Sequence, residues 1–274
     1  MPRTTFLYHT EAVGTSGHIS LPVEDTMPLQ ASIASAIGAG FGKARVDNFR
    51  HLDYLSIGSM ETQVVSSYSD KDKAYGTLAS VVIEDLNNLN VVTCDRIVSR
   101  LTSKHSRICK NPKNDGKEDE LNDTAPGSFI LHGTHFDNLK IAGHTIDIPL
   151  AVGLFSELST WESLNTAFET KEDLRKEINA QAMHPTTGTK LPVHNGIFAC
   201  TLAMFPEKLP RGITRKDHGL YVPHFGTIYA AEYYISATSR RLRMLHVDLG
   251  CTVEGCNGYG DSGANGSGYP GTGN

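Results

Sequence analysis

The sequence predicts a mainly β protein built from antiparallel sheets, arranged as a sandwich or as repeated β modules. Apolar and β-branched residues alternate with polar ones along much of the chain, as they do in strands that bury one face. Tight-turn signals such as Ala142-Gly143-His144 separate these segments. A helical period occurs in one region, at about residues 154–183. A β-solenoid is the alternative architecture, because similar strand units recur along the chain.

The predicted strands cover most of the chain between residues 45 and 249. Strand-like segments lie at 18–21, 45–69, 74–101, 128–148, 196–205, 220–237 and 240–249. Residues 30–41 fit either a buried strand with a glycine bend or a short apolar helix. The rest of the first 30 residues is predicted to be irregular, and residues 104–126 are predicted to form an exposed loop.

The last predicted strand alternates along residues 240–249. Its pattern places Leu245, Val247 and Leu249 toward the core. Met244, His246 and Asp248 are then expected to point outward. The basic residues 240–243 are interpreted as a solvated strand face.

Two short helices are predicted, at about 154–169 and 171–183. Apolar residues fall at helical spacing at Leu154, Leu158, Trp161, Leu164 and Phe168. Ser159-x-x-Glu162 has the pattern of a capping box, and Thr170-x-x-Asp173 is a looser version. Their charged outer face suggests a helical pair on a β core, in which Trp161 and Phe168 pack inward.

The domain prediction is a single mainly β domain over residues 1–250, with the helical insert at 154–183 and a glycine-rich tail at 251–274. The tail is rich in Gly, Asn and Ser, so it has little apolar surface to offset its ordering entropy. We therefore expect a flexible tail or a segment that a partner orders.

Composition narrows the classes of partner. The net charge of −5 argues against a nucleic-acid-binding face, which needs concentrated basic residues. No apolar run approaches the length of a membrane span. The first residues lack the apolar region of a signal peptide, which makes a cytoplasmic location the default.

The five cysteines do not form a disulfide framework for a chain of this length. Cys94 and Cys200 lie within apolar runs and are interpreted as buried small hydrophobic residues. Cys251 and Cys256 could pair in an oxidising compartment. They could bind a metal only with two further ligands from elsewhere in the chain.

Three phrases echo one another and carry a family resemblance. The phrases begin at Phe49, Leu86 and Phe136, and each has two polar residues, a leucine and an alternating strand after its first residue. Residues 136–143, 89–97 and 245–249 resemble the choice-of-anchor domains of bacterial surface proteins, over about 45–150 and 195–250. The resemblance implies a mainly β, non-catalytic extracellular module and brings no catalytic residues. The helical insert and the missing signal peptide depart from it.

One candidate metal site is the group His132, His135, Asp137 and His144. Imidazoles and a carboxylate are common ligands of zinc and non-haem iron. On a simple strand, however, His132 and His135 point to opposite faces unless Gly133 allows a bulge. A divalent metal ion is therefore the alternative to a protein without a cofactor.

Acid–base and nucleophilic catalysis have weaker signals. The acidic candidates are scattered along the chain: Asp47, Asp53, Glu61, Asp95, Asp137, Asp147, Glu232 and Asp248. The sequence contains no G-x-S-x-G elbow and no phosphate-binding glycine loop after a strand.

An aromatic binding surface is predicted from Tyr221, Tyr229, Tyr233 and Tyr234, which fall in one strand-rich segment. Tyrosine suits interfaces because it combines a large rigid ring with a polar tip. The plainer interpretation is that tyrosine favours strands.

The function predicted first is that of a non-enzymatic structural or binding protein, self-assembling or associated with a cell surface. Its expected partners are other copies of the chain, another protein or a glycan. One alternative is a metal- or carboxylate-dependent enzyme with its site near His132, His135, Asp137 and His144. The other is a carbohydrate-binding module that uses the tyrosines.

Overall fold

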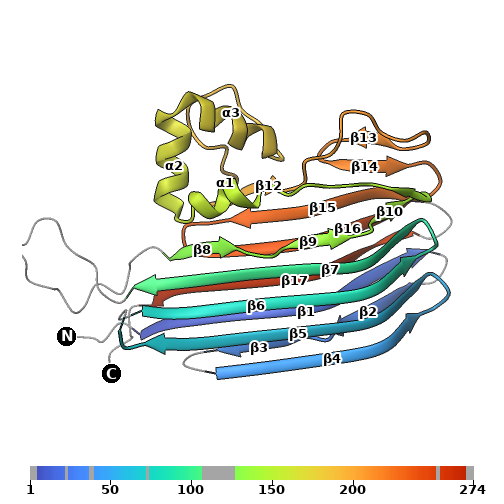
Figure 1. Ribbon diagram of the computed structural model, residues 1–274, viewed down its shortest axis with the longest axis horizontal. Helices are drawn as coiled ribbons and strands as arrows, with labels where there is room; N and C mark the ends of the chain where they lie inside the picture. The colour runs from blue at the N-terminus through green and yellow to red at the C-terminus, as the bar shows by residue number, and fades with distance from the viewer. Residues whose placement is uncertain are drawn as a thin grey trace, which may run out of the picture.

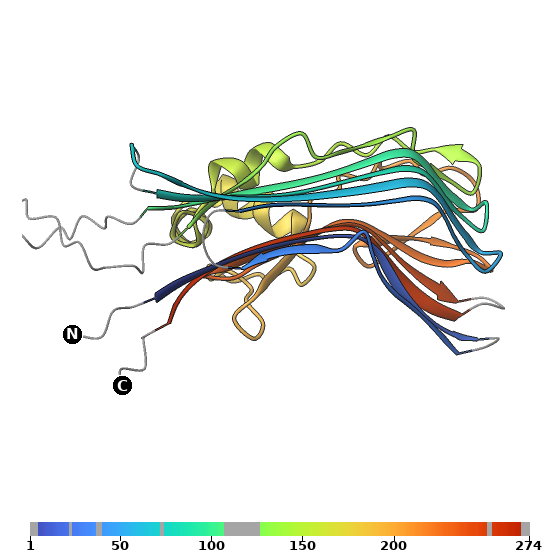
Figure 2. The same ribbon diagram turned by 90° about the horizontal axis from the view of Figure 1, so that it is seen from below.

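Two antiparallel sheets lie face to face in the computed structural model, and Figure 2 shows them edge-on. The structure describes residues 5–21, 24–36, 40–71, 74–106, 127–250 and 254–269. The predicted mainly β, sandwich-like fold is confirmed. The solenoid alternative is wrong, because neighbouring strands in both sheets run antiparallel and do not wind in successive coils.

The first layer is sheet A, with nine strands among the described residues. They are β1 (Thr5–Leu21), β2 (Asp25–Gln30), β3 (Ile33–Ala36), β12 (Phe198–Thr201), β13 (Thr214–Lys216), β14 (Gly219–Val222), β15 (Gly226–Ile235), β16 (Ser239–Gly250) and β17 (Glu254–Tyr269). The order is β13-β14-β15-β16-β17-β1-β2, while β12 pairs with β15 and β3 with β1.

The second layer is sheet B, with eight strands in the described part of the chain. They are β4 (Gly40–His51), β5 (Leu55–Ser69), β6 (Ala74–Asn88), β7 (Val92–Ser106), β8 (Ser128–Leu131), β9 (His135–Asp137), β10 (Lys140–Ile141) and β11 (His144–Thr145). The order is β11-β10-β7-β6-β5-β4, with β8 and β9 beside β7. Residues 107–126 of the predicted loop lie outside the described residues.

The predicted glycine turn in the segment 128–148 is confirmed. Ala142 and Gly143 both have positive φ, of 50° and 79°, and they join β10 to β11. Positive φ at both central residues suits a two-residue hairpin turn. The apolar residues on both sides of the turn are buried, including Ile141 and Ile146.

The expectation of a flexible tail, or of a tail ordered by a partner, is wrong for residues 254–269. They form β17, which lies between β16 and β1 in the middle of sheet A. Backbone pairing with neighbours on both sides replaces the apolar burial that the composition lacks. The boundary expected at residue 250 therefore falls inside the sheet.

The glycines of β17 leave room for large side chains on adjacent strands. A Cβ at Gly258 would lie 3.2 Å from Nε of Arg243, and one at Gly263 would lie 3.0 Å from Cγ of Glu11. On the inner face, the hydroxyl of Tyr259 accepts a 2.7 Å hydrogen bond from Nδ2 of Asn88 in sheet B. Glycine here serves close packing within and between the layers.

β1 is a second correction, because only residues 18–21 of this segment were predicted as a strand. Its residues are mostly small and polar, so the alternation is weak. β1 pairs with β17 on one side and with β2 and β3 on the other. Within residues 30–41, β3 and the start of β4 form strands, and residues 37–39 lie outside the described part.

The helical insert contains three helices and not two: α1 (Val152–Glu157), α2 (Trp161–Thr170) and α3 (Glu172–Gln181). The helix predicted at 154–169 is divided into α1 and α2 because Thr160, and not Ser159, is the N-cap of α2. Its hydroxyl accepts a 3.0 Å bond from the Ser163 amide, and Ser163 Oγ accepts a 3.1 Å bond from the Thr160 amide. Lys171 is the N-cap residue of α3, and its side chain makes no capping hydrogen bond.

The helices lie along one edge of the sandwich, beside β8 and β12 (Figure 1). The amide of Phe129 in β8 donates to the carbonyl of Ser159 at 2.9 Å. On the other side, the amide of Ala151 donates to the carbonyl of Leu202 at 2.8 Å. Phe168 is fully buried and Trp161 packs against the core. Among the described residues, no helix is long and apolar enough to cross a membrane.

Both sheets bend together along a line that we call the crease (Figure 2). We assign the crease to the mid-strand residues with positive φ at which the strand ladders skip a pair: Asn48 and Asp85 in sheet B, and Ala231 and Gly260 in sheet A. The alternation of side chains shifts by one residue at this line. Ile83 and Leu86, for example, are both buried, although they are three positions apart.

The crease explains one wrong prediction in β16. Met244 was expected to point outward, but Met244 and Leu245 are both fully buried. Strict alternation fails here because β16 crosses the crease between its neighbours at Ala231 and Gly260.

The echoed phrases coincide with turns. Leu52 and Leu89 have φ near 50° and lie in the links β4–β5 and β6–β7. Asn138, which precedes Leu139, also has a φ of 50° and follows β9. The shared pattern thus marks left-handed turn residues at the ends of strands.

The free edge of sheet B is charged. β4 ends the strand order, and Lys43 and Arg45 both bond to Glu61 of β5, at 2.9 and 3.2 Å. Charged side chains on an edge strand oppose pairing with another chain. This arrangement works against self-association through β4.

Acid is expected to destabilise the fold through His105. This histidine is buried beside Phe129, and burial lowers its pKa from 6.5 to about 4. Between those values the unfolded chain binds a proton that the folded chain excludes, so the free energy of unfolding falls as the pH falls. The loss should reach about 3 kcal/mol at pH 4. Urea unfolding of the wild type and of His105→Gln between pH 4 and 7.5 measures it. Parallel pH profiles for the two proteins would contradict this assignment.

Candidate functional site

The outer face of sheet A carries a buried carboxylate, Glu232 of β15, which is 3% exposed. Its position follows from the crease. The neighbouring Ala231 has a φ of 50°, which shifts the alternation so that Tyr229 and Glu232 share the outer face while Tyr233 enters the core. Arg243 and His246 of β16 are likewise three residues apart and both lie beside Glu232.

Two histidines hold the carboxylate of Glu232. Nε2 of His218 donates to Oε1 and Nδ1 of His246 donates to Oε2, each at 3.2 Å. Burial alone would raise the pKa of Glu232, but the two histidine hydrogen bonds outweigh it and lower the pKa to about 2. Glu232 is therefore ionised at neutral pH, and both of its oxygens are occupied.

Tyr229 fixes the two imidazole rings. Its ring centroid lies 4.6 Å from that of His218 and 5.3 Å from that of His246. A Cβ at Gly219 would lie 2.7 Å from Cδ1 of Tyr229, so glycine makes room for the ring. Burial raises the pKa of Tyr229, which keeps its hydroxyl protonated.

The network continues toward the end of β16. Nε2 of His246 lies 3.0 Å from Oδ1 of Asp248. Asp248 is the register partner of Cys256 in β17. The nitrogen, the carboxylate oxygen and the thiol lie within 4.8 Å of one another, and no other such trio of metal-ligating groups occurs among the described residues.

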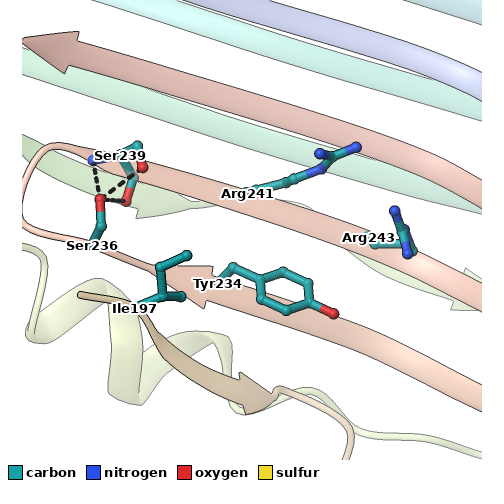
Figure 3. A pocket seen from close by; sticks show the side chains of 6 residues that line it. All are labelled: Ile197, Tyr234, Ser236, Ser239, Arg241 and Arg243. Carbon is teal, nitrogen blue, oxygen red and sulfur yellow. Dashed lines mark hydrogen bonds between the residues drawn. The ribbon is translucent and has the colours of Figure 1, made fainter. Parts of the chain in front are cut away.

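A shallow pocket of about 300 Å³ lies on the same face. Figure 3 shows its lining: Ile197, Tyr234, Ser236, Ser239, Arg241 and Arg243. Tyr234 extends from β15, and the two arginines extend from β16 beside it. The two serines close one end through a hydroxyl–hydroxyl bond of 2.7 Å.

Asp261 of β17 anchors the two pocket arginines. Its carboxylate accepts from Nη2 of Arg241 at 2.8 Å and from Nε of Arg243 at 3.1 Å. Asp261 is 8% exposed, whereas the Arg241 side chain is 49% exposed. The guanidinium of Arg241 is thus held on one side and open to solvent on the other.

The interpretation of residues 240–243 as a solvated face is wrong for Arg240. This residue is 3% exposed and its guanidinium lies over the ring of Phe129, 4.6 Å from the centroid. It donates to the carbonyls of Ser236 and Ser239. Burial lowers its pKa. Arg240 therefore fastens the end of β16 to the core.

The four predicted tyrosines separate. Tyr229 and Tyr234 lie on the outer face of sheet A, and Tyr221 shares this face because it pairs with Thr227, the partner of Asp248. Tyr233 is 2% exposed and packs edge-on to Phe155, at 5.9 Å between ring centroids. Tyr233 is therefore a core residue.

The predicted histidine group lies on the other layer. Nδ1 of His135 donates to the carbonyl of Gly133 at 2.8 Å, and its Nε2 lies 3.4 Å from Asp137. His132 and His144 are exposed, and the described residues of this region form no trio of ligand atoms within 4.8 Å. Gly133 has a φ of 67° and lies between β8 and β9, so the chain interrupts the strand there.

The sequence held a partial signal for the site on sheet A. His246 and Asp248 were predicted to point outward, and Cys251 and Cys256 were predicted to bind a metal only together with two ligands from elsewhere. Cys251 lies outside the described residues. The sequence could not place Asp248 beside Cys256, because residues 251–274 were expected to form a tail outside the sheets. Glu232 was one of many scattered acidic residues until its strand partners were known.

Comparison with known proteins identifies a family but no individual relative. No curated protein matched the chain, and no solved structure matched it either. A family described as a domain of unknown function (DUF8256) matches residues 6–193. This range covers sheet B and the helices, whereas Glu232, His246 and the pocket arginines follow it in the chain. Because the match spans more than half of the sequence, the protein belongs to this DUF8256 family.

Proposed function

We propose that the protein is a non-enzymatic binding protein that takes an acidic saccharide in the pocket beside Tyr234. The observation that carries the proposal is the pair Arg241 and Arg243, which Asp261 holds from one side. Guanidinium groups bind carboxylates and sulfates through paired hydrogen bonds. The open side of Arg241 is therefore suited to an anionic group.

The other lining residues fit a sugar. Tyr234 is partly exposed beside the arginines and offers an aromatic surface with a polar tip. Ser236 and Ser239 supply hydroxyl groups at the end of the pocket. A volume of about 300 Å³ is at the lower limit of small-molecule pockets, which favours one or two sugar rings over a large ligand.

The chemistry of Glu232 favours binding over acid–base catalysis. Its pKa of about 2 leaves no proton to donate near neutral pH, and its oxygens already accept from two histidines. This carboxylate therefore serves to hold the face together. A glycan ligand also agrees with the extracellular role that the choice-of-anchor resemblance implies.

Calorimetric titration with oligogalacturonate, and with a neutral oligosaccharide of equal length, tests the proposal. The acidic sugar should bind the wild type, and its affinity should fall with added salt. Arg241→Gln and Tyr234→Ala should each weaken binding by about tenfold or more, which corresponds to about 1.4 kcal/mol.

Matched controls are Arg211→Gln and Tyr221→Ala, exposed residues that do not line the pocket. Both should bind like the wild type. Equal affinity for the neutral sugar, or wild-type affinity in Arg241→Gln, would rule out this use of the pocket.

A further inference from the structure

The geometry points to a transition-metal site on the outer face of sheet A, with His246, Asp248 and Cys256 as ligands and Zn²⁺ as the ion of choice. The three donors come from two adjacent strands, β16 and β17. Asp248 and Cys256 are register partners, and His246 is two residues before Asp248 on the same face. The trio is separate from the saccharide pocket, which none of its members lines.

The hydrogen bonds of His246 leave one nitrogen for a cation. Oε2 of Glu232 lies 3.2 Å from Nδ1 of His246, and a carboxylate oxygen at this distance accepts the N–H of the ring. In neutral imidazole the other nitrogen then carries a lone pair. That nitrogen, Nε2, lies 3.0 Å from the carboxylate oxygen of Asp248. A lone pair and a carboxylate repel each other unless a cation stands between them.

Glu232 supplies the support that metal-binding histidines ordinarily have. Such a histidine usually donates its second N–H to a carboxylate, which fixes the ring and its tautomer. Here that carboxylate is 3% exposed, and Tyr229 packs against the imidazole ring. Glu232 is thus a positioning residue, and it holds Nε2 toward Asp248 and Cys256.

The donor set selects the metal. One nitrogen, one carboxylate oxygen and one thiolate suit Zn²⁺ or Co²⁺ better than Ca²⁺ or Mg²⁺, which prefer oxygen ligands alone. Tetrahedral zinc holds its ligand atoms about 3.3–3.8 Å apart at ordinary bond lengths. Nε2 of His246 lies 3.0 Å from Oδ1 of Asp248, and the ligand atoms of all three residues lie within 4.8 Å of one another, so small side-chain rotations would bring them into place.

Access from solvent is open, and a fourth position is available. Cys256 is exposed, and His246 and Asp248 are partly exposed. His18 of β1 is the register partner of Cys256 on its other side. Its Nδ1 lies 3.2 Å from the hydroxyl of Thr26 in β2, so this histidine is engaged on the side of β1 that faces away from β17. Water would complete four-coordination.

Titration of the reduced, metal-free full chain with Co²⁺ alone tests the site. Co²⁺ bound by a thiolate absorbs in the near ultraviolet, and four-coordinate Co²⁺ absorbs strongly in the visible. We expect one equivalent to bind with both signals, and Zn²⁺ to displace it. Cys256→Ser should abolish the near-ultraviolet band, and Asp248→Asn and His246→Gln should each weaken binding at least tenfold.

His218→Gln is the matched control for His246→Gln. Both variants remove one histidine bond to Glu232 and one ring beside Tyr229, but His218 is outside the trio. His218→Gln should keep Co²⁺ affinity within about twofold. Thermal unfolding checks that each variant is folded, and Cys256→Ser changes an exposed side chain only.

Three results would overturn the site. The first is a wild type that binds no stoichiometric Co²⁺ or Zn²⁺, in which case a proton alone separates His246 from Asp248. The second is a near-ultraviolet band that survives in Cys256→Ser. The third is an equal loss of affinity in His218→Gln and His246→Gln, which would assign the effect to the packing around Glu232.

Discussion

A chain that ends at residue 250 is expected to lose its cooperative fold. The deletion removes β17, which pairs with β16 along one side and with β1 along the other. It also removes the Tyr259 hydroxyl that bonds to buried Asn88 in sheet B. Domains of this size are stable by about 5–15 kcal/mol, and the loss of a central strand exceeds that margin.

Circular dichroism and urea unfolding measure the effect, and a chain that ends at residue 269 is the control. The control keeps all of β17 and should unfold cooperatively with a midpoint close to that of the full chain. A truncation at residue 250 with a wild-type unfolding midpoint would show that β17 does not contribute to the sandwich.

Replacement of Glu232 by alanine is expected to lower the free energy of unfolding by about 3 kcal/mol. The side chain is 4% exposed, and its removal leaves His218 and His246 without their acceptor. It also removes the carboxylate partner of the Tyr234 hydroxyl and one of the two carboxylates near Arg243, which keeps its bond to Asp261. Breaking a buried charged network from its centre costs more than removing a pair at the surface.

Asp248→Asn provides the comparison, since Asp248 contacts the same histidine from the exposed side. Its side chain is 48% exposed, so its pair with His246 is screened by solvent. The expected change is below about 1 kcal/mol at neutral pH. Urea unfolding in the presence of a chelator separates these effects from any bound metal. Equal destabilisation by the two variants would contradict the central role of Glu232.

Much of the fold could be predicted because burial follows a simple period. Sheet B came from alternating Val, Ile and Leu residues, and the turn at Ala142-Gly143 followed from backbone freedom. Those signals are local, so a single sequence displays them. The helical region was also visible, although a cap one residue later, at Thr160, divided it differently.

β1 and β17 could not be predicted because their stability is not local. Each is rich in small residues and gains its burial from the strands beside it. Gly258, for example, is useful only because Arg243 lies over it. An argument from the apolar area of the segment itself therefore assigns such a strand to a tail.

The candidate site was hidden for a related reason. Alternation places residues 229 and 232 on opposite faces, whereas the positive φ of Ala231 brings them together. His218 reaches Glu232 from the link between β13 and β14, which no pattern in the sequence connects to β15. The histidines near residue 135 were more conspicuous only because they are neighbours in the sequence.

The crease ties the lengths of separate strands to one another. Asn48, Asp85, Ala231 and Gly260 belong to four strands, and each left-handed residue must stand level with its neighbours for the layers to bend as one. One residue inserted into a single strand would shift half of that strand by one residue relative to the strands on both sides. Its buried side chains would then face solvent. Length can change freely in the turns, whereas within the strands the sandwich tolerates substitution far better than insertion or deletion.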